Sequence, residues 1–520
     1  MCYSSGCRLP CGVAVSVEST ELGVERIVTD VCIIGSGAGG AAAAWTLARA
    51  GLRVICLEAG GHFGQQDFSQ DLGVASRQLY AEDGQRLMRG NVFIPVAGGE
   101  CLGGSTVVNS GICFRLPRWR FEEWHRDHGL DFEYDELLPF LEKAEQMLQV
   151  TPSNPAVYGG NNAACMRGLK ALGWSGGPMP RNAPACVGCG ACNTGCPTGA
   201  KLSVARTFIP AAEELGARFI TNARVEVAHS SGSRVTGVQA TLLDPATRAP
   251  IGSLRVDSRA VVLAGSAIQS PAFLLHNGLG NNHVGRHLKV HPASGVIGIG
   301  SDRIEGWNGT PQGFYCDEFL RDDRMILESW WATPEVFWIN FPFGAQGGER
   351  MRDFAQMTAL GGMVADQSEG TVRPHGLPGK SRISYDLIEA DRVRILKVLE
   401  RSAELLLAAG MDTVYAGIHG LAPLRSVAEV REQLRPDRVR LKQMMTLYSS
   451  HPHGSIRMGN DARHSAVDCR GELYGSEGLF VMDGSICPDV LGVNPQVSII
   501  ALSLMLAGGL AAQLGGRLPG

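Results

Sequence analysis

The sequence lacks both the basic excess of a nucleic-acid-binding protein and the amino-terminal pattern of a secreted one. Its 47 lysines and arginines are outnumbered by 51 aspartates and glutamates, which gives a formal net charge of -4. Without a basic surface to attract a phosphate backbone, no nucleic-acid partner is expected. No charged head followed by an apolar core stands at the amino end, so we expect a cytoplasmic protein.

Long uninterrupted apolar runs, internal repeats and low-complexity tracts are also lacking. The most apolar late stretch, residues 497–514, is broken by Ser498, Gly508 and Gln513. It follows an Asn-Pro pair at Asn494, and proline is favoured in the first turn of a helix. We therefore expect a buried helix here and no transmembrane segment.

Cysteine and glycine are abundant, with 15 and 67 residues. In a reducing compartment, cysteines are expected as free thiols or metal ligands rather than disulfides. Cys186, Cys189, Cys192 and Cys196 follow the spacing C-x2-C-x2-C-x3-C-P, which bacterial ferredoxins use to ligate an iron–sulfur cluster. An iron–sulfur cluster, a zinc or redox-sensing thiol site, and a loop of reduced cysteines without metal all remain open at this point.

Residues 30–61 carry the pattern of a dinucleotide site. They read DVCIIGSGAGGAAAAWTLARAGLRVICLEAGG, which predicts a strand, a glycine turn, a helix and a second strand. Gly35 allows the tight turn, Gly37 lets a diphosphate approach the helix amino end, and Gly40 lets helix and strand pack closely. Glu58 ends the second strand, where a carboxylate suits a ribose diol.

Three later segments favour FAD over NAD as the dinucleotide. Residues 100–111 (ECLGGSTVVNSG) form a second glycine-rich loop, which an NAD domain does not need. Residues 261–271 (VVLAGSAIQSP) and 478–488 (GLFVMDGSICP) each read as a buried strand that ends in small or acidic residues. Together with residues 30–61 these make four distant segments, which suit an extended ligand such as FAD that has a nucleotide at one end and a flavin at the other.

With these motifs the chain resembles the glucose–methanol–choline (GMC) oxidoreductases over residues 30–514. The resemblance also rests on SAIQSPAFLLHNGLG (266–280), SHPHGSIRMG (450–459) and the block at 478–499. Within the family it is most similar to the long-chain alcohol oxidase and cholesterol oxidase branches. The resemblance implies an α/β fold: a Rossmann-like FAD-binding domain with a parallel sheet, and an α+β substrate domain built on an antiparallel sheet.

The resemblance also implies domains that are discontinuous in sequence. Residues 1–24 are expected to be a tail, 25–130, 186–300 and 440–520 the FAD-binding domain, and 131–185 and 301–439 the substrate domain. The aromatic segment 325–346 lies in the substrate domain, where it lines an apolar pocket or forms an ordinary sheet core.

The implied activity is oxidation of an alcohol (CH-OH) to a carbonyl, with hydride transfer to FAD. His451 matches the family's catalytic base, and Asn494 would hydrogen-bond the substrate oxygen. The helix after Asn494 would direct the positive end of its dipole at the flavin. Val108 stands where covalently flavinylated relatives have histidine, so FAD is expected to be bound non-covalently.

The remaining implied contacts concern the cofactor. The positions expected to bind FAD are Gly35, Gly37, Gly40, Glu58, Gly103, Gly104, Ser105, Asn109, Val225, Ala264, Gly265, Asp483, Gly484, Pro495 and Gln496. The expected partners are a small-molecule alcohol, which would be hydrophobic if segment 325–346 lines the pocket, and either oxygen or another electron acceptor.

Two alternative activities stay open. The cysteine segment resembles that of flavin-dependent glucose dehydrogenase catalytic subunits, so an acceptor-linked dehydrogenase could pass electrons through a cluster. The family also includes a non-redox hydroxynitrile lyase, because one fold can host several reactions.

Overall fold

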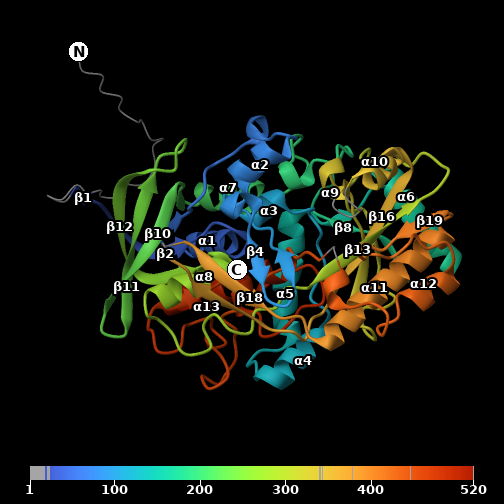
Figure 1. Ribbon diagram of the computed structural model, residues 1–520. Helices are drawn as coiled ribbons and strands as arrows, with labels where there is room; N and C mark the ends of the chain where they lie inside the picture. The colour runs from blue at the N-terminus through green and yellow to red at the C-terminus, as the bar shows by residue number, and fades with distance from the viewer. Residues whose placement is uncertain are drawn as a thin grey trace, which may run out of the picture.

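The computed structural model describes residues 18–19 and 24–518, except 339–340, 342–343, 377–378 and 445–446. The amino-terminal cysteines Cys2, Cys7 and Cys11, and most of the tail expected at 1–24, lie outside this part. Within it, the elements fall into two lobes. Figure 1 shows β10–β12 at one end of the molecule and α11, α12 and β19 at the other.

The first lobe is built on an eight-stranded sheet. Its strands run in the order β10 (Ala223–Ser231), β11 (Arg234–Leu243), β12 (Pro250–Leu263), β2 (Val24–Ile34), β3 (Val54–Leu57) and β9 (Arg218–Ile220), with β1 (Glu18–Ser19) on β2 and β20 (Leu479–Val481) on β12. The β12–β2, β2–β3, β3–β9 and β12–β20 pairs are parallel, whereas β10, β11 and β12 are antiparallel. The predicted parallel dinucleotide sheet is confirmed.

Small side chains bring the first helix close to this sheet. In α1 (Ala38–Arg49), Ala41, Ala42, Ala43 and Ala44 are all fully buried. Helix α13 (Gln496–Gln513) packs on α1 and on α5 (Tyr134–Leu148), and it joins the same hydrophobic core. This core holds together segments from both ends of the chain.

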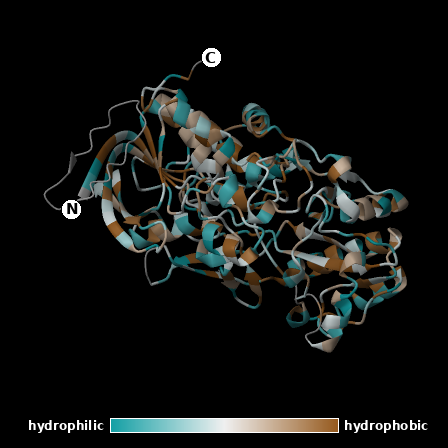
Figure 2. Cartoon of the chain, turned by 90° about the horizontal axis from the view of Figure 1, so that it is seen from above, coloured by the Kyte–Doolittle hydropathy of each residue, from teal (hydrophilic) through white to brown (hydrophobic). Residues whose placement is uncertain are grey.

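Helix α13 is also the one helix in the described residues that is long and apolar enough to cross a membrane. In the structure 67% of it is buried inside the protein. Figure 2 shows brown, hydrophobic residues on the strands of the parallel sheet beside the helices. The buried helix expected from the sequence is therefore what the fold contains.

The second lobe is built on a six-stranded antiparallel sheet. Its order is β19 (Thr413–Tyr415), β13 (Ala293–Ile299), β16 (Met357–Val364), β15 (Met325–Ser329), β14 (Phe314–Cys316) and β7 (Gly176–Pro178). Helix α11 (Glu389–Ala408) packs on β16 and β13. Strand β13 lies before residue 300, yet it pairs in this sheet because its apolar side chains, mostly fully buried, complete the second core.

The fold also contains a separate four-stranded sheet. It joins β17 (Gly370–Pro374), β18 (Ser381–Tyr385), β4 (Leu87–Arg89) and β5 (Phe93–Pro95). The other α-helices are α2 (Leu72–Leu79), α3 (Ser105–Val108), α4 (Arg118–His128), α6 (Gly159–Leu172), α7 (Phe208–Glu214), α8 (Ser266–His276), α9 (Pro334–Trp338), α10 (Ala345–Met351) and α12 (Val427–Gln433). Because β4 pairs with β18, this sheet joins segments that are far apart in sequence. Leu87, Phe93 and Pro374 from its strands line the large cavity described next.

Candidate active site

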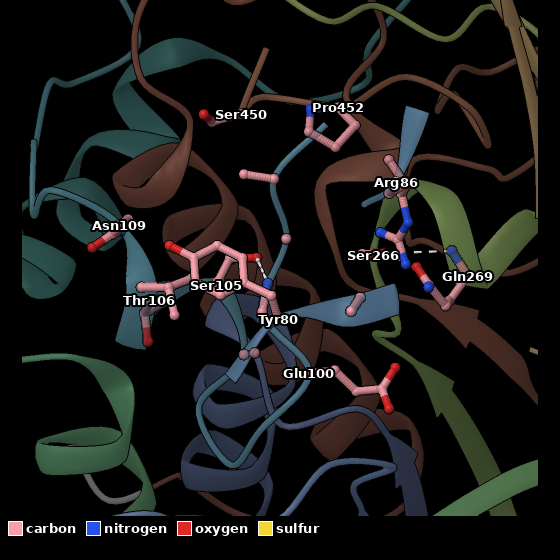
Figure 3. A pocket seen from close by; sticks show the side chains of 18 of the residues that line it. Tyr80, Arg86, Glu100, Ser105, Thr106, Asn109, Ser266, Gln269, Ser450 and Pro452 are labelled. Atoms are coloured by element: carbon pink, nitrogen blue, oxygen red, sulfur yellow. Dashed lines mark hydrogen bonds between the residues drawn. The ribbon is translucent and has the colours of Figure 1, made fainter. Parts of the chain in front are cut away.

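One large cavity of about 1600 Å³ joins the two lobes. It is lined by the turn after β2, the start of α3, the start of α8, β15 and the segment before α13. Sites for drug-sized ligands measure roughly 300–1,000 Å³, so this cavity has room for a dinucleotide and a second molecule. Figure 3 shows part of its wall, with Ser105, Asn109 and Ser266 among the labelled residues.

The glycines after β2 form the cradle that the fingerprint predicts. A Cβ atom on Gly35 (φ +96°) would lie 2.5 Å from the Ala264 carbonyl oxygen, and one on Gly40 would lie 1.9 Å from that of Gly35. Gly37 lines the cavity at the N-cap of α1, and no atom lies within 4 Å of its Cβ position. This open space at a helix amino end fits a diphosphate.

A second loop closes on this cradle. A Cβ on Gly104 would lie 3.0 Å from the Gly37 Cα, and the Gly103 N–H donates to Ser36 Oγ over 3.0 Å. Glu58 follows β3, where its carboxylate accepts hydrogen bonds from Ser36 and from the Gly60 N–H. Burial raises the pKa of Glu58. The arrangement fixes a carboxyl group at the cavity wall, as a ribose site requires.

The opposite part of the wall comes from the carboxyl-terminal block. Asp483 accepts from the Ser266 N–H and the Ser485 N–H, which ties this block to the start of α8. Asn109 Nδ2 donates to Gln496 Oε1 over 2.6 Å, at the amino end of α13. The contact between Asn109 and Gln496 joins segments 387 residues apart into one wall.

Most of the cofactor positions expected from the sequence border this cavity. Those that line it are Gly35, Gly37, Glu58, Gly104, Ser105, Asn109, Val225, Ala264, Gly265, Asp483, Gly484, Pro495 and Gln496, and Val108 lines it too. Gly40 and Gly103 are not among the lining residues and pack behind the wall. The residues present therefore fit an FAD molecule.

His451 and Asn494 meet at the same cavity. Asn494 Nδ2 lies 3.4 Å from His451 Nε2, and both residues line the cavity. His453 is turned away: it is fully buried, is not a lining residue, and its Nδ1 lies 2.6 Å from the His451 carbonyl oxygen. Burial lowers the pKa of His451 to about 3, so its imidazole is neutral near neutral pH.

A chain of hydrogen bonds assigns the proton on His451. The Gly492 N–H donates to His291 Nε2 over 2.9 Å, which leaves the proton of the neutral His291 ring on Nδ1. His291 Nδ1 lies 3.3 Å from His451 Nδ1 and donates to it, so His451 carries its own proton on Nε2. The Nε2–H of His451 and the amide of Asn494 thus lie beside each other at the cavity wall.

Glu328 is the main polar group that sequence reasoning missed. It lies on β15, lines the cavity, and is only 8% exposed. Burial raises its pKa to about 7, against the opposing effect of a hydrogen bond from Asn494. Gln312 Nε2 donates to Glu328 Oε2 over 3.4 Å, whereas Glu328 Oε1 has no hydrogen-bond partner among the described residues. The available signal was the single acid in the run MILESWW, in which every other residue except Ser329 is apolar.

The aromatic segment after Glu328 has both of the roles considered for it. Trp330, Trp331 and Val336 line the cavity. Phe337 and Phe341 belong instead to a buried cluster, with Trp331 packed against Phe337 at 4.5 Å between ring centroids. The wall beside the polar groups is therefore largely apolar.

The four cysteines of the ferredoxin-like run do not form a cluster site. No group of three or more His, Cys, Asp or Glu within the described residues is arranged to hold a metal ion. Instead, the buried Arg181 donates to Cys192 Sγ over 3.1 Å and to Cys186 Sγ over 3.8 Å, and Cys189 is exposed. The positive charge beside these sulfurs comes from a side chain, and the donor set does not fit an iron–sulfur cluster.

The cysteine loop has a structural connection to the cavity wall. Buried Lys201 Nζ donates to the carbonyl oxygens of Val107, Asn109 and Cys192 over 2.5–2.7 Å. Arg181 donates to the Ser110 carbonyl oxygen through Nε and Nη2. Two buried cations therefore fix residues 107–110, which follow the second glycine loop.

Comparison with known proteins gives a consistent result. Family models for the GMC oxidoreductases match residues 35–293 (the amino-terminal model) and 366–503 (the carboxyl-terminal model). An uncharacterized GMC-type oxidoreductase of Mycobacterium tuberculosis is 37% identical over 94% of this chain and 76% of its own. A long-chain-alcohol oxidase of Arabidopsis thaliana is 28% identical over 96% of this chain and 70% of its own.

Solved structures show the same fold at lower identity. Pyridoxine 4-oxidase from Mesorbium loti superposes with a TM-score of 0.69 at 19% identity, covering 92% of this chain and 98% of its own. A formate oxidase of Aspergillus oryzae gives a TM-score of 0.71 at 16% identity, covering 94% and 98%. The matched models span most of the chain and include the glycine turns and the carboxyl-terminal block that line the cavity. The chain therefore belongs to the GMC oxidoreductase family, whose cofactor is FAD.

Proposed function

We propose that this protein oxidises a hydrophobic alcohol to a carbonyl compound with non-covalently bound FAD. The observation that carries the proposal is the pair of N–H donors on His451 and Asn494, 3.4 Å apart at the wall of a cofactor-sized cavity. An alcohol oxygen placed between them accepts from both. Such fixed donors stabilise the negative charge that develops on that oxygen as its proton leaves.

The proposed roles differ in one respect from the expectation drawn from the sequence. His451 was expected to take the hydroxyl proton, but its Nε2 already carries one and its Nδ1 accepts from His291. Glu328 is the better acceptor, because its carboxyl borders the same cavity, contacts Asn494 and has a pKa of about 7. When bound, FAD would accept the hydride from the carbinol carbon.

The surroundings support the substrate class and the mode of cofactor binding. Trp330, Trp331 and Val336 offer an apolar wall that excludes water and suits a hydrocarbon chain. Val108, which lines the cavity, has no nucleophilic atom for a flavin linkage. We propose oxygen as the electron acceptor, since the relatives of named activity include a long-chain-alcohol oxidase and a pyridoxine 4-oxidase.

Anaerobic mixing with alcohols of increasing chain length tests the proposal. We expect a primary alcohol of medium or long chain to bleach the flavin absorbance, and air then to restore it with release of one hydrogen peroxide per flavin. A panel in which no alcohol bleaches the flavin would contradict alcohol oxidation and favour a non-redox reaction on the same fold. Bleaching without reoxidation by air would instead indicate a dehydrogenase, and iron and sulfide analysis would then test for a cluster.

A further inference from the structure

Arg86 is a buried cation with unused hydrogen-bonding capacity at the cofactor cavity. It precedes β4, is 5% exposed, and lines the cavity. Its Nε donates to Glu82 Oε1 over 3.1 Å, but its buried Nη2 has no partner among the described residues. Leaving a buried charged donor unpaired is costly, so this nitrogen points to a missing acceptor.

The position of Arg86 indicates which part of a dinucleotide it would meet. A Cβ atom on Gly98 would lie 3.3 Å from Arg86 Nη1 and 3.9 Å from Ser105 Oγ, so both groups flank one point of the wall. Ser105 begins α3 directly after Gly104, which touches Gly37 of the first glycine turn. Figure 3 shows Arg86 projecting toward the cavity that Ser105 and Gln269 also line.

The other basic residues around this cavity are paired or exposed. Arg224 donates to Glu226 over 2.9 Å and Arg248 to Glu100 over 2.8 Å. Arg77 and Lys380 are exposed. Among the described lysines and arginines that line the cavity, Arg86 is thus the buried one. The amino end of α1 supplies only partial positive charge to a dianionic group.

We propose that Arg86 binds the diphosphate of the dinucleotide, opposite the amino end of α1, with Glu82 orienting its guanidinium. The planar fork of arginine offers paired N–H donors to phosphate oxygens, which a lysine ammonium cannot reproduce. Glu82 occupies the Nε side, so the Nη2 side is left for the ligand. The assignment rests on the proposed FAD cofactor, but it does not depend on which substrate is oxidised.

The test measures ligand binding to the full-length protein rather than turnover. FAD release from the holoenzyme is followed by the rise in flavin fluorescence on dilution, and rebinding is then competed with ADP or with riboflavin. ADP carries the diphosphate without the flavin ring, and riboflavin carries the ring without phosphate. The variants are R86Q and R86K, with R89Q as the matched control because Arg89 is exposed on β4 and does not line the cavity.

We expect R86Q to weaken FAD and ADP binding about 10- to 100-fold, with riboflavin binding unchanged, because charge-assisted hydrogen bonds of this strength are lost. R86K should give an intermediate loss, and R89Q none. Equal ADP affinity in wild type and R86Q would overturn the proposal, as would a loss confined to riboflavin. If R86Q does not fold, R86K alone decides the test. ADP binding by R86K equal to that of wild type would refute the proposal that the paired N–H donors of Arg86 bind the diphosphate. If the protein does not oxidise alcohols, its ADP binding is still expected to depend on Arg86. Failure of the proposed function can therefore be distinguished from failure of the Arg86 assignment.

Discussion

The cofactor end and the catalytic end of the cavity are built in different ways. At the cofactor end, contiguous residues 34–40 and 103–105 supply glycine turns whose backbone forms the site. At the catalytic end, His291, Glu328, His451 and Asn494 come from four separate segments that meet only in the folded chain. Local sequence therefore specifies the first end, whereas the second depends on tertiary contacts.

The largest expected effect comes from breaking the backbone contacts of the cofactor end. In G40V the added Cβ would lie 1.9 Å from the Gly35 carbonyl oxygen, so α1 cannot pack on β2. We expect no folded, flavin-loaded protein, as judged by circular dichroism and the flavin-to-protein absorbance ratio. In the control G509A, at an exposed helical position on α13, no neighbouring residue outside the local helix lies within 4 Å of the Cβ position, and flavin content should be normal. Normal flavin loading of G40V would contradict the packing described for this turn.

The next effect isolates the catalytic end. E328Q removes the proposed proton acceptor but keeps the side-chain shape, so flavin reduction by alcohol should slow by about 10²–10⁴-fold. Flavin content should stay unchanged, because Glu328 lies outside the glycine turns. Stopped-flow absorbance checks the rate, with E335Q as the control since Glu335 is exposed and does not line the cavity. A rate in E328Q equal to that of E335Q would exclude this role.

A smaller effect connects the cysteine loop to the cofactor end. K201M leaves the carbonyl oxygens of Val107, Asn109 and Cys192 without their donor, so we expect a loss of about 2–4 kcal/mol in the free energy of unfolding. Denaturant titration measures it, and K170M, at an exposed position on α6, should change little. Equal unfolding midpoints in K201M and K170M would show that Lys201 does not hold residues 107–110.

The smallest effect is expected at the exposed cysteine. C189S should leave the unfolding midpoint, the flavin content and the rate of flavin reduction within error of wild type. Cys189 is exposed, and it belongs to no group of three or more possible metal ligands among the described residues. Elemental analysis of anaerobically purified wild type should find no stoichiometric iron. Iron that is present in wild type and lost in C189S would restore the cluster hypothesis for this loop.

These two ends also mark how far the sequence could predict the structure. The strand–turn–helix–strand order of residues 30–61 is observed as β2, α1 and β3, because each residue there acts through local backbone geometry. His451 and Asn494 were identified through a family resemblance, and the structure places them together. Glu328, His291 and Arg86 were missed because their surroundings come from residues distant in sequence.

The cysteine run is a pattern whose role the sequence left open. Its spacing suits a cluster, yet spacing alone does not say what lies beside the sulfurs. Arg181 precedes the run, and its guanidinium donates to Cys186 and Cys192. Lys201 follows the run and places a second buried cation against the Cys192 carbonyl. A ligand set is defined by tertiary geometry, which a linear pattern leaves undetermined.

The pH dependence of flavin reduction under anaerobic conditions tests the assignment of the catalytic end most directly. With Glu328 as proton acceptor, the rate should rise as its carboxyl ionises through a pKa of about 7 and then level off, and this inflection should vanish in E328Q. His451, with a pKa of about 3, would produce no inflection in that range. A flat profile in the wild type, or the same inflection in E328Q, would contradict the proposed chemistry.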